Sequence, residues 1–229
     1  MFLFLDTANL SEIARGVESL PLAGVTTCPT LIVQEHPASF WGLLKEIRGI
    51  IGPDRILHAQ VMGGTAEEIL ADARALWERA GGEGPFYVKV PVTGEGFRAM
   101  PMLRREGIAF TATTIHSVSQ AMLAAEHGAA FLAPYINHIE DAGESGEEMV
   151  GQTVRFLERH GLSSQILAAS FRNVRQILAV LEAGAHTVTL APELAWKMAA
   201  HPMTEASVAK FRRAWDGAFG PQARVANLP

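Results

Sequence analysis

Cysteine and long apolar runs are scarce in this chain of 229 residues. The one cysteine, Cys28, excludes an intrachain disulfide framework and a zinc site made of several thiolates. No stretch reaches the ~20 consecutive apolar residues that a membrane span needs, and the apolar start of the chain ends at Asp6. We therefore expect neither a signal peptide nor a membrane span, and we predict a globular protein of the cytoplasm.

Positive charge is also limited, with 19 Lys+Arg against 24 Asp+Glu and a net charge of −5 at pH 7. A mildly acidic chain lacks the basic surface that attracts nucleic acids or anionic membranes, so neither is expected as a partner. The 8 histidines include no His-Glu-X-X-His motif and no helical i, i+4 pair. We therefore expect no metal and no cofactor.

Short apolar runs recur along the chain, and longer segments with helical periodicity lie between them. Apolar runs without strict alternation are typical of parallel strands that are covered on both faces. The runs are Phe2–Leu5, Ala23–Thr26, Ile56–Val61, Phe86–Val90, Ile108–Thr113, Ala130–Pro134, Ile166–Ser170 and Thr187–Leu190. The expected helices include Glu67–Ala80, Phe97–Arg105, Val118–Glu126, Glu147–Glu158 and Val174–Glu182. Glycines that follow two of these segments, Gly107 and Gly184, mark helix ends.

Repeated strand–helix units predict a parallel sheet with right-handed crossovers. A doubly wound sheet would carry a glycine-rich turn after its first strand, but residues 6–10 contain no glycine. Eight units at this length instead predict an α/β protein with a (β/α)8 TIM barrel. We expect a single domain over residues 1–220, including an extra C-terminal helix, and a tail over residues 221–229.

The expected C-terminal helix, Thr204–Phe219, carries an apolar stripe. The stripe consists of Val208, Phe211, Trp215 and Phe219, spaced by three or four residues. It can pack on its own barrel or on a neighbouring subunit, and the pattern favours neither.

Polar residues stand at the carboxyl ends of most predicted strands, where barrel enzymes hold their catalytic groups. They are Asp6, Thr26, Thr27, Gln60, Lys89, Thr113, Thr114, Tyr135, Asn137 and Ser170. Single residues of these types are ordinary strand or cap residues. Together they predict a polar ring at one mouth of the barrel, suited to a small substrate rich in hydroxyl groups.

Lys89 lies within Phe86–Val92, a segment with the pattern of a strand buried on both faces. Burial disfavours the charged form of an amine, and a neutral amine is the nucleophile that forms a Schiff base with a ketone. The plainer alternatives are a lysine that reaches solvent or one that pairs with a carboxylate such as Asp6.

Several motifs in register resemble one known family. They are Leu5-Asp-Thr-Ala-Asn9, Ala23-Gly-Val-Thr-Thr27, Gln60-Val-Met62, Val88-Lys-Val-Pro-Val-Thr93, Ala133-Pro-Tyr135 and Ala168-Ala-Ser-Phe171. Together they resemble the short transaldolase family, in its fructose-6-phosphate aldolase branch, from Met1 to about Gly220. The resemblance implies a class I aldolase that forms or cleaves the C3–C4 bond of a ketose with a dihydroxyacetone-type donor. It also implies a homo-oligomer, a pentamer or a decamer.

The resemblance also implies roles for individual residues. Lys89 would form the imine, and Asp6 would hold donor hydroxyls together with the hydrogen-bond partners of the lysine. Water positioning and proton transfer are implied for Gln60, Thr113 and Tyr135. Ser170 would hold a phosphate, and we expect Thr26 and Asn137 to contact the substrate.

Two positions depart from the family pattern. Cys28 stands where asparagine usually contacts donor hydroxyls, and His138 stands where arginine usually binds phosphate. A thiol is a weak hydrogen-bonding group, and a neutral imidazole lacks the charged fork of arginine. Arg172 is a candidate replacement for the missing cation. Alternatively, Cys28 is a small buried residue and His138 faces solvent.

Three functions stay open at this point. Transaldolases of the family carry Glu and Phe where this chain has Gln60 and Tyr135, which favours an aldolase over a transaldolase. A barrel that binds a sugar or sugar phosphate without catalysis is the third possibility.

Overall fold

The computed structural model describes residues 2–228. Contacts along the chain divide it into two units, one that ends at Leu194 and one that begins at Ala195. Each unit is described by itself. The expected extent of a single domain, 1–220, stays a prediction.

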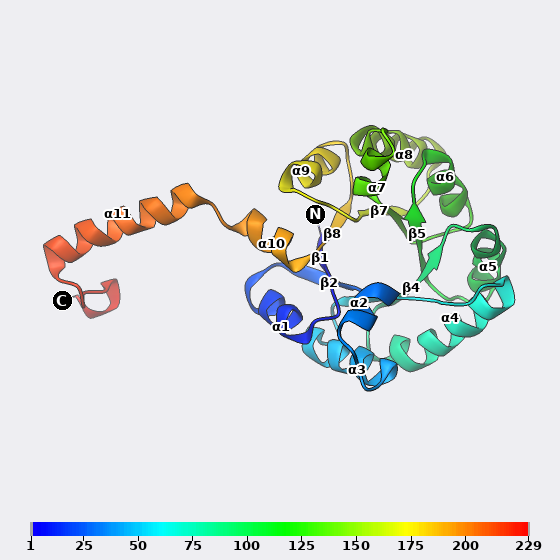
Figure 1. Ribbon diagram of the computed structural model, residues 1–229, viewed down its shortest axis with the longest axis horizontal. Coiled ribbons are helices and arrows are strands. Elements are labelled where there is room, and N and C mark those ends of the chain that lie inside the picture. The colour runs from blue at the N-terminus through cyan, green and yellow to red at the C-terminus, as the bar shows by residue number, and fades with distance from the viewer. Residues whose placement is uncertain (1, 229) are drawn as a thin grey trace. The chain divides into compact units, whose positions relative to one another are not determined.

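The first unit is a closed barrel of parallel strands whose spatial order follows the sequence (Figure 1). The strands are β1 (Phe2–Asp6), β2 (Leu22–Thr26), β3 (Ile56–Gln60), β4 (Phe86–Pro91), β5 (Phe110–Ile115), β6 (Phe131–Pro134), β7 (Gln165–Ala168) and β8 (Thr187–Leu190). Pairing of β8 with β1 closes the barrel. The predicted (β/α)8 barrel with an additional C-terminal helix is therefore confirmed.

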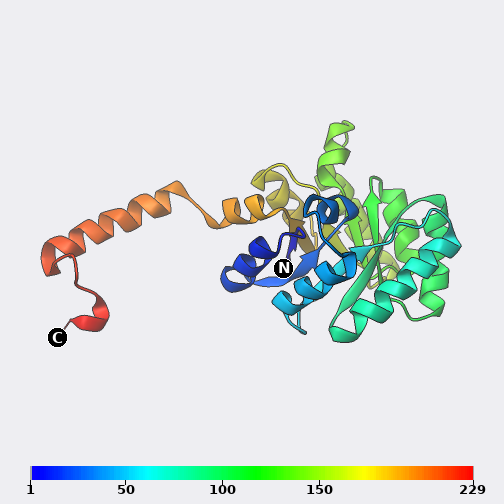
Figure 2. The same cartoon turned by 60° about the horizontal axis from the view of Figure 1, so that its bottom comes forward.

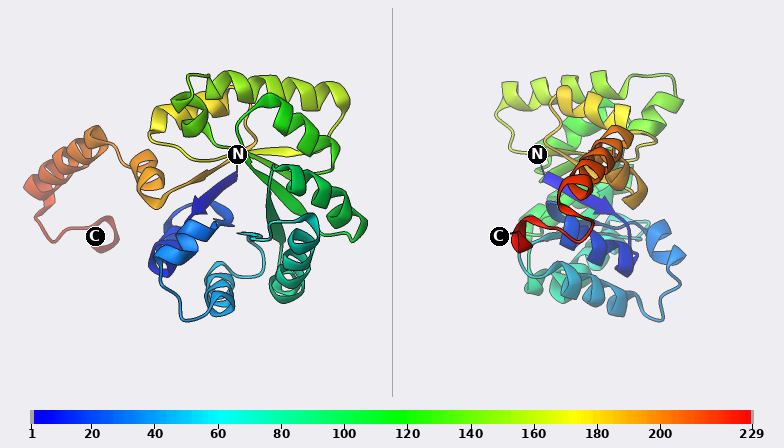
Figure 3. Two further views of the ribbon diagram at one scale, coloured as in Figure 1. Left: turned by 45° about the vertical axis from the view of Figure 1, so that its right-hand side comes forward. Right: turned by 90° about the vertical axis from the view of Figure 1, so that its left-hand side faces the viewer.

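Helices surround the strands, as Figure 3 shows, and Figure 2 shows α4 and α5 along the outer side of the barrel. The helices of this unit are α1 (Leu10–Ser19), α2 (Pro29–Gln34), α3 (Phe40–Ile51), α4 (Ala66–Ala80), α5 (Gly94–Arg105), α6 (Val118–Glu126), α7 (Ile136–Asp141), α8 (Gly146–His160) and α9 (Val174–Glu182). The short helices α2 and α7 follow β2 and β6. The sequence did not indicate them, because six residues are too few to show a periodicity.

The largest differences from the predicted strand boundaries are in β5 and β7, and the other boundaries differ by one residue at most. Strand β5 runs on to Ile115, whereas β7 ends at Ala168, before Ser170. Ser170, after the end of β7, has a φ of 59°, which is in the left-handed region and not in the extended region typical of strands. The predicted helix ends at Gly107 and Gly184 are confirmed by their φ values of 70° and 101°.

An aromatic cluster lies inside the barrel, formed by residues that precede the carboxyl ends of their strands. The rings of Phe4 and Phe131 lie edge-on to His58, with centroids 5.3 and 5.2 Å away, and Tyr87 stacks on it at 5.3 Å. His58 is fully buried, and its Nδ1 lies 2.9 Å from the Thr111 hydroxyl. Burial, reinforced by the nearby positive charge of Lys89, holds the pKa of His58 well below its usual value.

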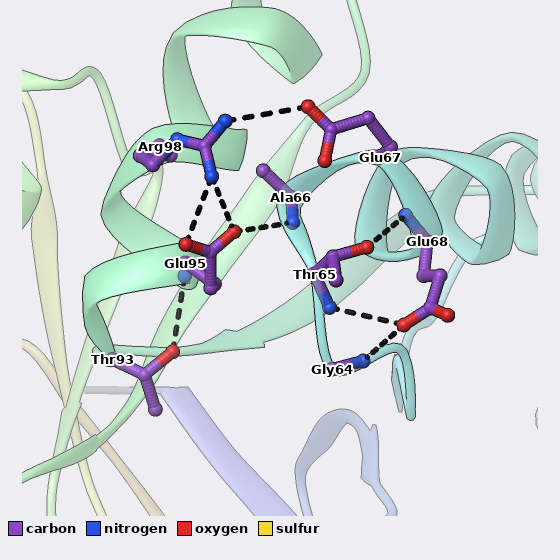
Figure 4. Close-up of polar contacts among 9 residues, drawn as sticks. Gly64, Thr65, Ala66, Glu67, Glu68, Thr93, Glu95 and Arg98 are labelled. Carbon is purple, nitrogen blue, oxygen red and sulfur yellow. Dashed lines mark hydrogen bonds and ion pairs between the residues drawn. The ribbon is translucent and has the colours of Figure 1, made fainter.

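A polar network joins the first turns of α4 and α5, which follow the strands that carry Gln60 and Lys89 (Figure 4). The Thr65 hydroxyl accepts a hydrogen bond from the backbone amide of Glu68. The Glu68 carboxylate in turn accepts hydrogen bonds from the backbone amides of Gly64 and Thr65. These backbone donors hold the pKa of Glu68 below its usual range. Glu95 accepts the Ala66 amide at 2.9 Å, so α5 helps to cap α4.

Replacing Thr65 by alanine removes the hydroxyl that caps α4. We expect Thr65→Ala to lower the free energy of unfolding by about 1 kcal/mol, because one amide of the first turn loses its acceptor. Urea denaturation at neutral pH measures this difference. Thr65→Ser keeps the hydroxyl and is the matched control, and equal stability of the two variants would contradict the prediction.

The second unit contains most of α10 (Pro192–Ala199) and all of α11 (Pro202–Phe219). Along α11, the side chains of Val208, Phe211 and Phe219 are 57%, 67% and 56% exposed. The Trp215 indole N–H donates to the Ala223 carbonyl at 3.1 Å, so the residues after α11 turn back toward that helix. Within residues 2–228, none of the helices is long and apolar enough to cross a bilayer.

Candidate active site

Lys89 lies inside the barrel on β4, and the residue is only 5% exposed. Its Nζ donates to the Thr27 carbonyl at 2.8 Å. Its neighbours in strand register are Gln60 on β3 and Thr111 on β5. Among residues 2–228 no ion pair joins Lys89 to Asp6, which was one of the alternative environments expected for this lysine.

A cavity of about 200 Å³ opens beside Lys89. Its walls include six residues singled out from the sequence, namely Asp6, Thr26, Cys28, Lys89, Tyr135 and Ser170. They come from different strands and loops because the carboxyl ends of parallel strands meet at one mouth of a barrel. This cavity is named the lysine cavity below.

A chain of hydroxyl groups ends at the Asp6 carboxylate in this cavity. The Thr26 hydroxyl donates to Asp6 Oδ1 at 2.6 Å, and it also lies 2.6 Å from the Thr189 hydroxyl. Because the one proton of Thr26 is given to Asp6, Thr189 must be the donor to Thr26. Thr189 was not predicted. The alternation of threonine with apolar residues in Thr187–Leu190 is the signal that could have identified it.

Tyr135 lies at the end of β6, and its hydroxyl accepts a hydrogen bond from Thr113 at 3.3 Å. Thr113 itself is buried on β5, so the two predicted proton-transfer residues are in contact. Thr114, within the last residues of β5, and Ser170, two residues after β7, adopt left-handed φ values of 58° and 59°. Such backbone is costly for residues other than glycine, and here it occurs where two strands meet the mouth.

Gln60 lines a second cavity of about 500 Å³, which also includes Thr27 and Cys28. Since Cys28 belongs to both cavities, they adjoin at this residue. Cys28 is half-buried and free, as the first residue before α2. We name this larger space the side cavity.

Asn137, His138 and Arg172 are not among the residues that line the lysine cavity. The Arg172 guanidinium is held by both oxygens of Asp141 at 2.8 Å, and Asn137 also donates to Asp141. The charge of Arg172 is therefore already paired by a carboxylate. No phosphate group is needed to balance it.

His138 faces a second histidine at the mouth. Its Nδ1 lies 3.4 Å from His116 Nε2, and the two rings are nearly parallel. Burial, and then the neighbouring His138, lower the pKa of His116. The position expected to bind phosphate thus holds an imidazole, His138, stacked on a second imidazole, His116.

No group of three or more histidine, cysteine, aspartate or glutamate side chains in residues 2–228 is placed to hold a metal ion. The polar groups that converge on the lysine cavity are hydroxyls, one carboxylate and one amine. Such an arrangement can bind a polyhydroxylated ketone and present a primary amine to its carbonyl carbon.

Comparison with solved structures supports the barrel and carries no information on activity, because the sequences are distant. Two mutant flavocytochrome b2 structures, one with sulfite bound and one with benzoylformate, align with TM-scores of 0.59 and 0.60 at 14% and 12% identity. A mandelate oxidase mutant aligns with a TM-score of 0.58 at 14% identity. The alignments cover 83% of this chain, but only 56%, 56% and 65% of those chains.

A sequence comparison is more specific. The family described as Transaldolase/Fructose-6-phosphate aldolase matches residues 3–220 of the chain. This range includes Lys89, all the other residues of the lysine cavity and α11. The chain therefore belongs to the transaldolase/fructose-6-phosphate aldolase family.

Proposed function

We propose that the protein is a class I aldolase that makes or breaks the C3–C4 bond of a ketose or ketose phosphate through a Schiff base on Lys89. The donor is a ketone of the dihydroxyacetone type. The observation that carries the proposal is the burial of the Lys89 amine beside a cavity lined by hydroxyl groups and Asp6. A buried amine without a carboxylate partner among residues 2–228 is a suitable nucleophile.

The reaction follows from the chemistry of the imine. The Lys89 nitrogen adds to the ketone carbon, and loss of water gives an iminium. The C3–C4 bond then breaks, and its electron pair moves toward the iminium to leave an enamine. The proton of the C4 hydroxyl must leave at this step. Tyr135, which lies at the mouth beside Thr113, first gives its own proton to the hydroxyl group that leaves as water when the iminium forms. The resulting phenolate then takes the C4 hydroxyl proton, directly or through water.

The hydroxyl chain has a separate task in this mechanism. Thr189, Thr26 and Asp6 form a wall whose carboxylate can accept hydrogen bonds from donor hydroxyls. Because Thr26 is oriented toward Asp6, the carboxylate is held before the ketone arrives. Preorganisation of this kind reduces the cost of ordering groups when the substrate binds.

The alternative reaction is transaldolase transfer, in which the enamine is passed to a second aldehyde. Gln60 and Tyr135 favour the aldolase, because transaldolases of the family carry Glu and Phe at these two positions. Cleavage of a ketose phosphate with and without an added aldehyde separates the two. An aldolase releases the donor without a second aldehyde, whereas a transaldolase requires one.

Reductive trapping tests the proposal directly. The protein is incubated with dihydroxyacetone and sodium borohydride, digested, and mapped by mass spectrometry. We expect the reduced adduct on Lys89, because only an imine is fixed by this treatment. Lys45 on the exposed surface of α3 is the internal control. Absence of an adduct on Lys89 would leave the non-catalytic sugar-binding barrel as the better description.

The expected homo-oligomer, pentamer or decamer, belongs to the same proposal. Its support is the exposed apolar stripe of α11, which includes Phe211 and Phe219. Light scattering on the full chain measures the assembly. A monomer at micromolar concentration would contradict this part of the proposal.

A further inference from the structure

The side cavity is apolar on almost every wall. Ile32 and Val33 of α2, Phe40 and Trp41 of α3, and Ala75 and Leu76 of α4 surround it. Phe40 and Trp41 meet edge-to-face with centroids 5.0 Å apart, and the Arg79 guanidinium lies 4.6 Å from the centre of the Trp41 ring. These contacts hold the aromatic wall in place. With a volume of about 500 Å³ the space falls in the range of small-molecule sites.

Three residues connect this space to the proposed Schiff-base lysine. Cys28 lines both cavities, and the Thr27 carbonyl accepts the hydrogen bond of Lys89. Gln60 is the register neighbour of Lys89 on β3. The two cavities therefore share a wall at Cys28, next to the residues that contact Lys89.

The charges around the side cavity disfavour the binding of a phosphate group there. The described lining of the side cavity contains no lysine, arginine or histidine, and its one charged residue is Asp72. Asp72 Oδ2 accepts the amides of Met62 and Gly63 at 2.8 Å each, which fixes a carboxylate in the wall. An anionic substituent would meet this carboxylate, and the nearby Arg79 guanidinium lies over the Trp41 ring and is not among the residues that line the cavity. Binding of an apolar substituent would instead be favourable, because its surface is removed from water.

We propose that the side cavity binds an apolar substituent of the acceptor aldehyde, an alkyl chain or an aryl ring. The proposal rests on the aldolase function given above. It divides the site into two parts. The lysine cavity, with its hydroxyl groups and Asp6, binds the polar donor ketone, and the side cavity selects aldehydes by their hydrocarbon part.

The test compares three acceptors with dihydroxyacetone as the donor: 3-phenylpropanal, glycolaldehyde and glyceraldehyde 3-phosphate. For the unmodified enzyme we expect kcat/KM for 3-phenylpropanal to exceed that for glyceraldehyde 3-phosphate by about tenfold or more. A preference for glyceraldehyde 3-phosphate overturns the proposal.

Two phenylalanine substitutions on α4 locate the effect. Ala75→Phe fills the side cavity, and we expect it to lower the ratio of kcat/KM for 3-phenylpropanal over glycolaldehyde about tenfold. Ala71→Phe places the same ring on the exposed face of α4 and should leave the ratio unchanged. An unchanged ratio in Ala75→Phe overturns the proposal.

Two further measurements separate the possible failures. If Ala75→Phe alters the particle mass seen by light scattering, a second copy of the chain covers the side cavity and the proposal is wrong. Trapping of dihydroxyacetone on Lys89 reports on the aldolase function alone. If dihydroxyacetone is trapped on Lys89 but 3-phenylpropanal is not preferred, the proposed aldolase function stands and the proposed role of the side cavity is wrong.

Discussion

Lys89→Met is expected to lower the turnover number by about a thousandfold or more, because among residues 2–228 no other lysine lines the lysine cavity. The Lys89 side chain is buried inside the barrel, and methionine replaces it with an unbranched apolar chain of similar length. The Thr27 carbonyl loses its hydrogen-bond donor, which we expect to cost about 1–3 kcal/mol of stability. The measurement is the rate of cleavage of a ketose phosphate under saturating conditions.

The control for this variant is Lys45→Met, which changes an exposed lysine on α3. Circular dichroism of both variants reports whether the barrel is retained. If Lys89→Met is folded and keeps more than about a tenth of the activity, the Schiff-base mechanism on this residue is wrong. Loss of dihydroxyacetone trapping in the same variant ties the lost activity to the imine.

The second large effect concerns acid. His58 is fully buried with a lowered pKa, so the folded chain resists its protonation, whereas in the unfolded chain it titrates near its usual value of 6.5. Its full contribution to stability is therefore present above about pH 6.5 and is lost as the pH falls below that value. One group of this kind changes the free energy of unfolding by at most about 1.4 kcal/mol per pH unit.

A double variant, His58→Phe with Thr111→Val, isolates this contribution. It replaces the polar pair by apolar side chains among Phe4, Tyr87 and Phe131. Urea denaturation near pH 7 and near pH 5 gives the pH dependence of the unfolding free energy. We expect the unmodified chain to lose about 2 kcal/mol more than the variant over this range.

His116 and His186 also have pKa values lowered by burial, and both remain in the double variant. The difference between the two proteins therefore reports His58 alone. Equal losses of stability in the two proteins would show that His58 is protonated without cost in the folded state.

The barrel and much of the site were predictable from local patterns. Apolar runs mark the strands, and the polar residue after each run is carried to the common mouth by the topology. Asp6, Thr26, Lys89 and Tyr135 were found in this way, and all of them line one cavity. These residues share a cavity because strand ends are a local property of the sequence and the closed barrel brings them together.

What the sequence did not reveal depends on contacts between distant residues. Arg172, the candidate cation for phosphate, is paired with Asp141, and no local pattern in the sequence indicates that these two residues are in contact. His58 lies in a run of apolar residues, and its polar partner Thr111 is two strands away. The side cavity is formed by α2, α3 and α4 together, and α2 itself is too short to leave a periodic pattern.

Closure of the barrel by β1 and β8 has a consequence for synthesis of the chain. Asp6 lies on the first strand and Thr189 on the eighth, yet both belong to one hydrogen-bonded chain at the mouth. The ribosome must synthesise nearly all of the barrel before the hydrogen bonds that join Thr189, Thr26 and Asp6 can form. Until then the first strand has only one of its two neighbours, and folding of the catalytic mouth waits for the last crossover.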